Sequence, residues 1–306
     1  MGKTAFVFSG QGAQYPGMGK EIYDVSAAAR RVFELSERLR PGTIEQCFSG
    51  TKEELALTVN TQPCLYTVDL AIAEAVKEIG IIPDAAAGFS LGEVAALTFS
   101  GFFGREEGFS FVQTRGILMN EAAQKNPGMM AAVMRMAPAQ VEEMAAGCGV
   151  FAVNYNSPQQ TVVAGSTEAM TEFIKQVKEA RGVAVPLAVS GAFHSPLMNE
   201  ASEKLAEVLK GIDCGKTWCP VYANVTAEPY PDSSDAKALT AAQVKSPVRW
   251  QSTIENMTAA GFDTFIEVGA GNTLTSLIKK IAPEVTAISI EKAEDLKKEE
   301  LNDVKK

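Results

Sequence analysis

The sequence predicts an α/β protein in which a large domain with a mostly parallel sheet carries a smaller inserted domain. Three observations support this fold class. A buried apolar strand near the start leads into a glycine-rich loop, and strand-like and helix-like segments alternate in both halves of the chain. After Pro127 the order of predicted strands and helices changes. With 306 residues, 46% of them hydrophobic and 21% charged, the chain can bury a large core.

The first part of the large domain, residues 1–126, begins with an apolar strand at 5–8. This strand delivers the loop Ser9-Gly10-Gln11-Gly12-Ala13-Gln14, and loops at strand ends are where sites are built. Three helices and one further strand complete this part. The helices are expected at 63–79, 93–99 and 105–123, and the strand at 81–88 leads toward Ser90.

The inserted domain is predicted to span residues 127–189. Strands are expected at 129–136, 151–155, 161–165 and 183–187, with helices at 138–146 and 167–181. The order βαββαβ within about 60 residues is that of a ferredoxin-like unit.

The large domain then resumes over residues 190–291. Helices are expected at 198–209, 252–260 and 273–281, and strands at 221–224 and 264–268. The remaining residues, 292–306, are rich in charge and are predicted to form a solvated tail.

Composition limits the classes of function. A net charge of -9 disfavours nonspecific nucleic-acid binding, which needs a basic surface. The sequence has neither an uninterrupted apolar run of membrane-spanning length nor a signal peptide at its start, so we expect a soluble, cytoplasmic protein. One histidine and five cysteines without a Cys-x-x-Cys pair predict no metal site, and Gly269-Ala270-Gly271 lacks the third glycine of a nicotinamide loop. No cofactor is therefore expected.

Ser90 is the candidate nucleophile. The segment Gly88-Phe89-Ser90-Leu91-Gly92 fits Gly-x-Ser-x-Gly, in which small flanking residues permit a sharp strand-to-helix turn that exposes the serine hydroxyl. The alternative interpretation is an ordinary tight turn.

His194 is the only histidine in the chain and is therefore the candidate base for Ser90. It lies in the segment Ser190-Gly191-Ala192-Phe193-His194-Ser195-Pro196, between a predicted strand and a predicted helix. A structural or exposed histidine is the alternative.

Three further residues could act beside this pair. Arg115, in the helix predicted at 105–123, could bind a substrate carboxylate through two parallel hydrogen bonds, although a surface salt bridge is the alternative. Gln11 and Leu91 could each donate a main-chain N–H to a tetrahedral oxyanion.

Seven segments occur in a specific order between residue 4 and about residue 280. They are Gly10-Gln11-Gly12-Ala13-Gln14, Thr61-Gln62-Pro63, the Ser90 turn, Arg115, Asn156-Ser157-Pro158, Gly191-Ala192-Phe193-His194-Ser195 and Glu267-Val268-Gly269-Ala270-Gly271. Together they resemble the malonyl-CoA:acyl carrier protein transacylases. The resemblance implies an α/β-hydrolase-like large domain with a ferredoxin-like insert.

The resemblance also implies a reaction and its residues. Ser90 would take malonyl from coenzyme A, His194 would move the proton, and the phosphopantetheine thiol of holo acyl carrier protein would then attack the ester. Arg115 would hold the malonyl carboxylate, with Gln11 and Leu91 as the oxyanion hole. A main-chain carbonyl at Gln243 would orient the histidine, and Gln62 is counted among the substrate-binding residues.

Two positions bear on how closely the chain follows the family. Phe89 stands where the family usually has histidine, so the polar contact which that histidine offers beside the nucleophile is absent. Phe193 matches the malonyl-selective pattern, because a bulky ring there would crowd an α-methyl branch. We therefore expect methylmalonyl-CoA to be a poor substrate.

The family's carrier protein is acidic, so docking should use basic residues at the mouth of the cleft. The candidates are Lys279, Lys280, Lys175, Lys178 and Arg181. Solvated helix faces are the alternative interpretation of these residues.

Other functions remain open at this point. A thioesterase would use the same acyl-serine, with an acid such as Glu172 or Glu179 to orient the histidine, although both fall on the insert's predicted helix. A noncatalytic module that docks the carrier protein is a second alternative, and an acyltransferase acting in trans in a polyketide pathway is a third. A short chain of this family is expected to serve fatty-acid biosynthesis as a monomer.

Overall fold

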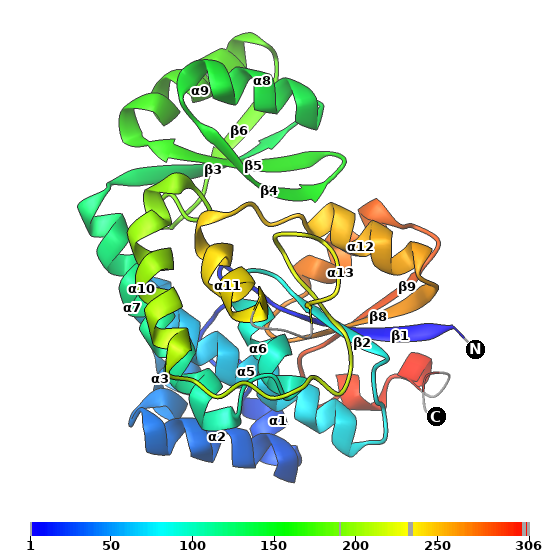
Figure 1. Cartoon of the computed structure of the whole chain (residues 1–306). Coiled ribbons are helices and arrows are strands. Elements are labelled where there is room, and N and C mark those ends of the chain that lie inside the picture. Colours follow the sequence, from blue (N-terminus) through cyan, green and yellow to red (C-terminus); the bar gives the residue numbers. More distant parts are fainter. Residues whose placement is uncertain (1, 190, 232–234, 302–303, 305–306) are drawn as a thin grey trace.

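The protein contains two separate sheets, one parallel and one antiparallel (Figure 1). The structure is a computed structural model that describes residues 2–189, 191–231, 235–301 and 304. The predicted fold class, a parallel α/β sheet combined with a separate βαββαβ unit, is confirmed. The first residue of the predicted second segment, Ser190, lies outside the described residues, and the domain boundaries themselves stay a prediction.

The large sheet has the strand order β7-β2-β1-β8-β9, and all its recorded pairings are parallel. Side chains alternate along β1, so that Phe6 and Phe8 point to one face and Ala5 and Val7 to the other. Both faces are covered, as expected for parallel strands. The strands are β1 (Lys3–Phe8), β2 (Ala85–Gly88), β7 (Val221–Tyr222), β8 (Phe262–Val268) and β9 (Thr286–Ile290).

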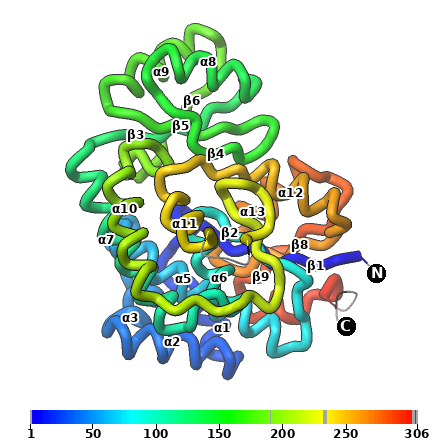
Figure 2. Tube along the Cα trace, in the orientation of Figure 1, coloured from blue at the N-terminus to red at the C-terminus, as the bar shows by residue number. Residues whose placement is uncertain are grey.

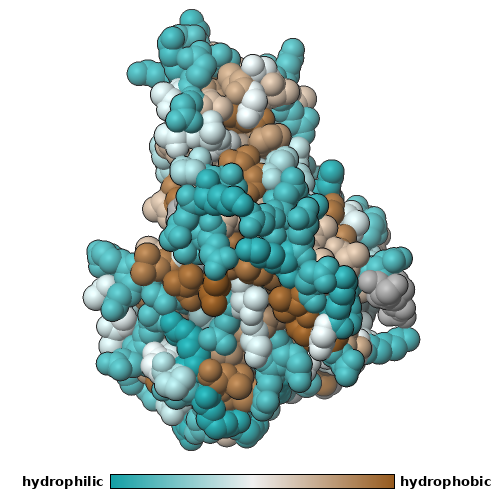
Figure 3. All heavy atoms as spheres, turned by 60° about the vertical axis from the view of Figure 1, so that its left-hand side comes forward, coloured by the Kyte–Doolittle hydropathy of each residue, from teal (hydrophilic) through white to brown (hydrophobic). Residues whose placement is uncertain are grey.

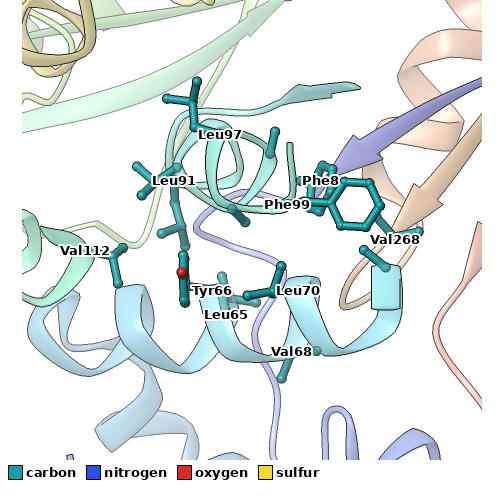
Figure 4. Packing of buried hydrophobic residues seen from close by; sticks show 14 of the residues in the cluster. Phe8, Leu65, Tyr66, Val68, Leu70, Leu91, Leu97, Phe99, Val112 and Val268 are labelled. Atoms are coloured by element: carbon teal, nitrogen blue, oxygen red, sulfur yellow. The ribbon is translucent and has the colours of Figure 1, made fainter. Parts of the chain in front are cut away.

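Helices pack on both faces of this sheet. One face is covered by α2 (Ala27–Leu39), α5 (Thr58–Glu78), α6 (Leu91–Phe99), α7 (Arg105–Lys125) and α10 (Asn199–Lys210), and the other by α12 (Trp250–Ala259) and α13 (Thr273–Ile281). Figure 4 shows Phe8 and Phe99 packed together above α5, and their ring centroids lie 5.6 Å apart. The α6 helix is therefore buried between the sheet and α5, and it fixes the turn that precedes it.

The small sheet has the order β4-β5-β3-β6 and is antiparallel. Two helices cover its outer face, away from the large sheet (Figure 1). Figure 2 follows the chain from α7 into this unit and back to α10. Its elements are β3 (Gly128–Met134), α8 (Pro138–Cys148), β4 (Phe151–Ser157), β5 (Gln160–Ser166), α9 (Thr167–Glu179) and β6 (Val183–Pro186).

Main-chain hydrogen bonds seat the small sheet on the large domain. The Tyr155 N–H donates to the Val248 carbonyl at 2.9 Å, and the Val248 N–H donates to the Val153 carbonyl at 2.8 Å. This pairing places Asn154 and the following residues of β4 directly above the segment that leads into α12.

Several elements differ from the sequence prediction. The helix expected at 63–79 begins earlier, at Thr58, so Pro63 lies inside it rather than at its start. The sequence analysis predicted no helix before Thr58, so it missed α2 and also α1 (Lys20–Val25), α3 (Thr43–Ser49) and α4 (Lys52–Ala56). Later in the chain it missed α11 (Asp235–Ala242) and the strand β9, which lies beside β8.

The solvated tail predicted at 292–306 is wrong in part. Leu301 is 1% exposed, and Leu296 and Val304 pack against the same core cluster. The side chain of Asp295 accepts the Glu291 N–H at 2.9 Å, which holds the start of this segment in place. Residues 302, 303, 305 and 306 lie outside the described residues.

Within the described ranges, no helix is long and apolar enough to cross a bilayer. Figure 3 shows one face covered mostly by hydrophilic side chains, with apolar patches across the middle of the molecule.

Candidate active site

Ser90 occupies a strained turn between β2 and α6. Its φ of 53° and ψ of -101° lie in a region that side-chain-bearing residues seldom adopt. A Cβ atom on Gly92 would lie 2.2 Å from the Phe8 carbonyl oxygen, and one on Gly88 would lie 2.0 Å from the Gly92 carbonyl carbon. Both flanking glycines are therefore required by close backbone approach, which is the geometry of a nucleophile elbow.

His194 is in hydrogen-bond contact with this serine. Ser90 Oγ lies 2.7 Å from His194 Nε2, while His194 Nδ1 lies 3.0 Å from the Gln243 carbonyl oxygen and 3.2 Å from that of Ser246. Carbonyl oxygens only accept, so Nδ1 carries the ring proton and Nε2 is free to accept the serine proton. Burial, together with the nearby Arg115 charge, lowers the pKa of His194 to about 4. The imidazole is therefore neutral at physiological pH and ready to act as a base.

Arg115 places a buried cation at the same point. Its guanidinium donates to Ser90 Oγ at 3.2 Å and to Gln243 Oε1 at 2.8 Å. Burial lowers its pKa only to about 10, so it stays charged. No carboxylate forms an ion pair with it within the described part of the chain. The remaining N–H groups can therefore receive a carboxylate from a substrate.

The two predicted oxyanion donors lie at the ends of adjacent strands. Leu91 is the first residue of α6, so its N–H has no acceptor within the helix. Gln11 follows β1, and its side-chain Nε2 lies 3.3 Å from Thr58 Oγ1. Because β1 and β2 are neighbouring parallel strands, both loops open at the same edge of the sheet. Their role as an oxyanion hole stays a prediction.

A cavity of about 220 Å³ lies between the two sheets beside this serine turn. The Oδ1 atoms of Asn154 and Asn156 are buried and have no hydrogen-bond partner in the residues that the structure covers. Both asparagines line the cavity, opposite the loop that carries Gln11. Two residues of the cavity wall therefore carry buried acceptors that are unsatisfied. Its apolar wall includes Phe89, whose ring packs edge-on against Trp250 with centroids 5.6 Å apart.

Two other predicted residues lie close to the site without contacting the serine. Phe193 is 5% exposed and belongs to the core cluster. Gln62 is buried on α5, and its Nε2 lies 3.4 Å from Met119 Sδ on α7. The substrate-binding roles of both residues stay predictions.

Three residues were missed by the sequence analysis. Asn224 accepts the Ser90 N–H at 2.7 Å and donates to the Gly88 carbonyl at 2.6 Å, so it spans the elbow. Glu93 and Tyr230 lie behind it, joined by a hydrogen bond of 2.6 Å. The available signal was the position of Asn224 at the end of the strand predicted at 221–224, where parallel strands bring polar groups together.

Residues 5–302 match the acyl transferase domain family. The chain belongs to this family. It is 40% identical over 304 residues to the malonyl CoA-acyl carrier protein transacylase of Bacillus subtilis (strain 168), which covers 97% of this chain and 96% of that relative. It is 36% identical over 295 residues to the protein of the same name from Synechocystis sp. (strain ATCC 27184 / PCC 6803 / Kazusa), covering 96% of this chain and 99% of that relative.

Solved structures of acyl transferases agree closely with the fold. A malonyl CoA-acyl carrier protein transacylase from Clostridium perfringens ATCC 13124 gives a TM-score of 0.94 at 37% identity, covering 99% of this chain and 97% of the other. Another, PlMCAT in complex with the holo type II PKS acyl-carrier protein AntF, gives 0.93 at 32% identity, covering 96% and 97%. The acyl transferase fold is thus shared along nearly the whole chain.

We expect Gly92→Ala to lose about 3 kcal/mol of unfolding free energy, because the added methyl meets the main chain of β1. Urea unfolding followed by circular dichroism measures this loss. Gly147→Ala is the matched control, since Gly147 lies in α8 with nothing within 4 Å of the added Cβ. That control should gain about 0.5–1 kcal/mol from helix propensity. Equal stability of the two variants would contradict the close approach.

The lowered pKa of His194 predicts the pH dependence of Ser90 reactivity. Labelling of Ser90 by the uncharged reagent phenylmethylsulfonyl fluoride should proceed at a nearly constant rate from pH 5.5 to 8, because the imidazole stays neutral there. A histidine with an ordinary pKa near 6.5 would slow labelling about tenfold at pH 5.5. Intact-protein mass measures the rate, with Ser90→Ala as the unlabelled control. A midpoint near 6.5 would show that burial does not set the protonation of His194.

Proposed function

We propose that this acyl transferase moves a malonyl group from coenzyme A to the phosphopantetheine thiol of acyl carrier protein through an ester on Ser90. The observation that carries this proposal is the Arg115 guanidinium, 3.2 Å from the nucleophilic oxygen and bound, among the described residues, to neutral acceptors. A cation there selects an acyl group that ends in a carboxylate. The names of the relatives at 40% and 36% identity support the same substrate.

In the first half-reaction, Ser90 Oγ attacks the thioester carbonyl while its proton passes to His194 Nε2. The oxyanion of the tetrahedral intermediate lies toward the N–H groups of Leu91 and Gln11. Collapse of the intermediate breaks the carbon–sulfur bond, and the leaving sulfur of coenzyme A takes the proton from the imidazolium. The products are a malonyl ester on Ser90 and free coenzyme A.

In the second half-reaction, the thiol of the carrier protein gives its proton to the same His194 Nε2. The resulting sulfur nucleophile attacks the ester carbonyl, and Ser90 leaves with the proton that the imidazole returns. The carrier protein departs with a malonyl thioester, and the enzyme regains its starting state. One base therefore serves both halves of a ping-pong transfer.

The acyl donor, a coenzyme A thioester, and the acyl acceptor, the carrier protein, share a pantetheine arm with two amide N–H groups, and we assign this arm to the cavity between the sheets. The buried, unpartnered Oδ1 atoms of Asn154 and Asn156 would accept those N–H groups once the side chains turn toward the cavity that they line. The apolar side of the cavity, which includes Leu274 and Leu277, would pack against the methylene and methyl groups of the arm.

Docking of an acidic carrier protein is assigned to Lys279 and Lys280. They are exposed in the last turn of α13, the helix whose Thr273, Leu274 and Leu277 line the cavity. The candidates on the small domain are less well placed. Lys175 and Lys178 belong to α9, which lies on the outer face of that domain (Figure 1).

A hydrolase is less well supported by the orientation of the histidine. Its Nδ1 faces two main-chain carbonyls rather than a carboxylate. Glu172 and Glu179 both lie on α9, on the far side of the small sheet. The assembled Ser90–His194 pair also argues against a noncatalytic docking module.

The pathway is proposed to be fatty-acid synthesis, with an acyltransferase of a polyketide pathway as the alternative. A monomer in the cytoplasm that does not bind nucleic acid is proposed as well.

The transfer is tested by intact-protein mass after brief exposure to malonyl-CoA. We expect a malonyl adduct on the wild type, no adduct on Ser90→Ala, and loss of the adduct when holo acyl carrier protein is added. Loss of the adduct to water at the same rate without the carrier protein would favour a hydrolase. Absence of any adduct would favour the docking module.

The role of Arg115 predicts a charge-selective defect. Arg115→Ala should lower kcat/KM for acylation by malonyl-CoA about 100-fold or more, because two charge-assisted hydrogen bonds are lost. Acylation by acetyl-CoA, which lacks the carboxylate, should fall far less. Arg105→Ala is the matched control, since Arg105 begins the same helix but pairs with Glu74 at the surface. Equal losses for both acyl groups would contradict carboxylate recognition by Arg115.

A further inference from the structure

Glu93 is a buried carboxylate that the reaction outlined above does not use. It lies three residues after Ser90 in α6 and is 1% exposed. One carboxylate oxygen accepts the Tyr230 hydroxyl at 2.6 Å, and the other accepts the Asn224 main-chain N–H. A buried acid in this position needs a reason, because burying a charge is costly.

Two residues with amide side chains, Asn224 and Gln243, connect Glu93 to the reacting groups, Asn224 through its main-chain N–H. Asn224 spans the elbow by holding the Ser90 N–H and the Gly88 carbonyl. The Gln243 amide donates to the Ser90 carbonyl at 2.8 Å and accepts from Arg115. It also stabilises the Glu93 carboxylate. The acid is thus linked to both the nucleophile and the guanidinium without touching either.

The charges of Glu93 and Arg115 complement each other. Arg115 is 1% exposed, and the groups that bind its guanidinium are neutral. Glu93 is the principal negative charge that acts on this guanidinium. A buried cation needs a compensating charge, but a direct ion pair would occupy the donors that face the substrate. An acid held behind neutral amides compensates the charge and leaves those donors open.

We propose that Glu93 is a positioning residue that balances the charge of Arg115 through Asn224 and Gln243 and thereby tunes how strongly the site binds a substrate carboxylate. The inference rests on the proposed function. Since the malonyl carboxylate and Glu93 are both attracted to one cation, ionised Glu93 weakens malonyl binding. Protonated Glu93 strengthens it.

Glu93 is the group of this network that titrates near neutral pH. Burial raises its pKa to about 7. Two titratable groups face α6 from neighbouring segments. Arg115 on α7 has a pKa of about 10, and His194, in the segment before α10, has a pKa of about 4. Burial raises the pKa of Tyr230 and that of Tyr66, which reaches α6 from α5 at Thr98. The sheet side presents the apolar residues 5–8 of β1 and the apolar strand β2. Malonyl carboxylates, with an ordinary pKa of about 4, stay ionised from pH 5.5 to 8.5.

The test compares two rates of Ser90 modification across that pH range. The kcat/KM for acylation by malonyl-CoA is divided by the labelling rate with uncharged phenylmethylsulfonyl fluoride, which leaves the part due to the carboxylate. In the wild type this ratio should fall as the pH rises through about 7. The fall should be on the order of tenfold, as for partly buried charges at an effective dielectric constant of about 20. Glu93→Gln should hold the ratio near its low-pH value throughout.

Glu106→Gln is the matched control, because it removes an acidic charge from the exposed first turn of α7. Its ratio should follow the wild type. Tyr230→Phe keeps the charge of Glu93 but removes the hydroxyl that stabilises it, so the midpoint should move to higher pH. This variant provides the test if Glu93→Gln does not fold. A pH-independent ratio in the wild type, or an unmoved midpoint in Tyr230→Phe, overturns the inference. Failure of the proposed function would instead appear as the absence of any malonyl adduct on Ser90.

Discussion

Gln243 holds Ser90, His194 and Arg115 in one arrangement. Its main-chain carbonyl accepts a hydrogen bond from His194 Nδ1–H, and its side-chain oxygen accepts one from Arg115. Its side-chain nitrogen donates a hydrogen bond to the Ser90 carbonyl. Gln243 is uncharged, so its hydrogen bonds do not neutralise the charge of Arg115. A buried amide with all its groups paired is also directional, because any rotation would leave polar atoms unsatisfied.

The parallel sheet brings these groups together from distant parts of the sequence. Gln11 follows β1, Ser90 follows β2 and Asn224 follows β7, and these three strands are neighbours with the same direction. Their carboxyl ends therefore open at one edge. Arg115 and His194 reach this edge from α7 and from the chain that returns from the small domain. The small domain closes the edge from above and contributes the asparagine acceptors of the cavity.

Sequence reasoning found the residues whose chemistry is unusual and missed those that act through burial. Ser90 has a motif, His194 is the only histidine and Arg115 stands in a pattern shared with the family. Glu93, Asn224 and Tyr230 have no such mark, since their contacts join residues more than 130 positions apart. Likewise, the βαββαβ order followed from local periodicity. The place of β9 beside β8 depends on a parallel pairing that no local pattern encodes.

The choice of carbonyl groups to orient His194 fits the charge of the acyl group. A carboxylate in that place would raise the basicity of the imidazole, as in serine hydrolases. It would also add a negative charge close to Arg115, the proposed binding site of the malonyl carboxylate. Two carbonyl groups fix the tautomer without adding that charge, although they leave the pKa of His194 at about 4. In the first half-reaction the weaker base suffices because the leaving group is a thiol, which departs far more readily than an amine or alkoxide. In the second half-reaction the leaving group is the Ser90 oxygen, and an imidazolium with a lowered pKa is a stronger acid to protonate it. For the role proposed for Arg115, the lower basicity of His194 is therefore the consequence of keeping a further carboxylate away from this cation.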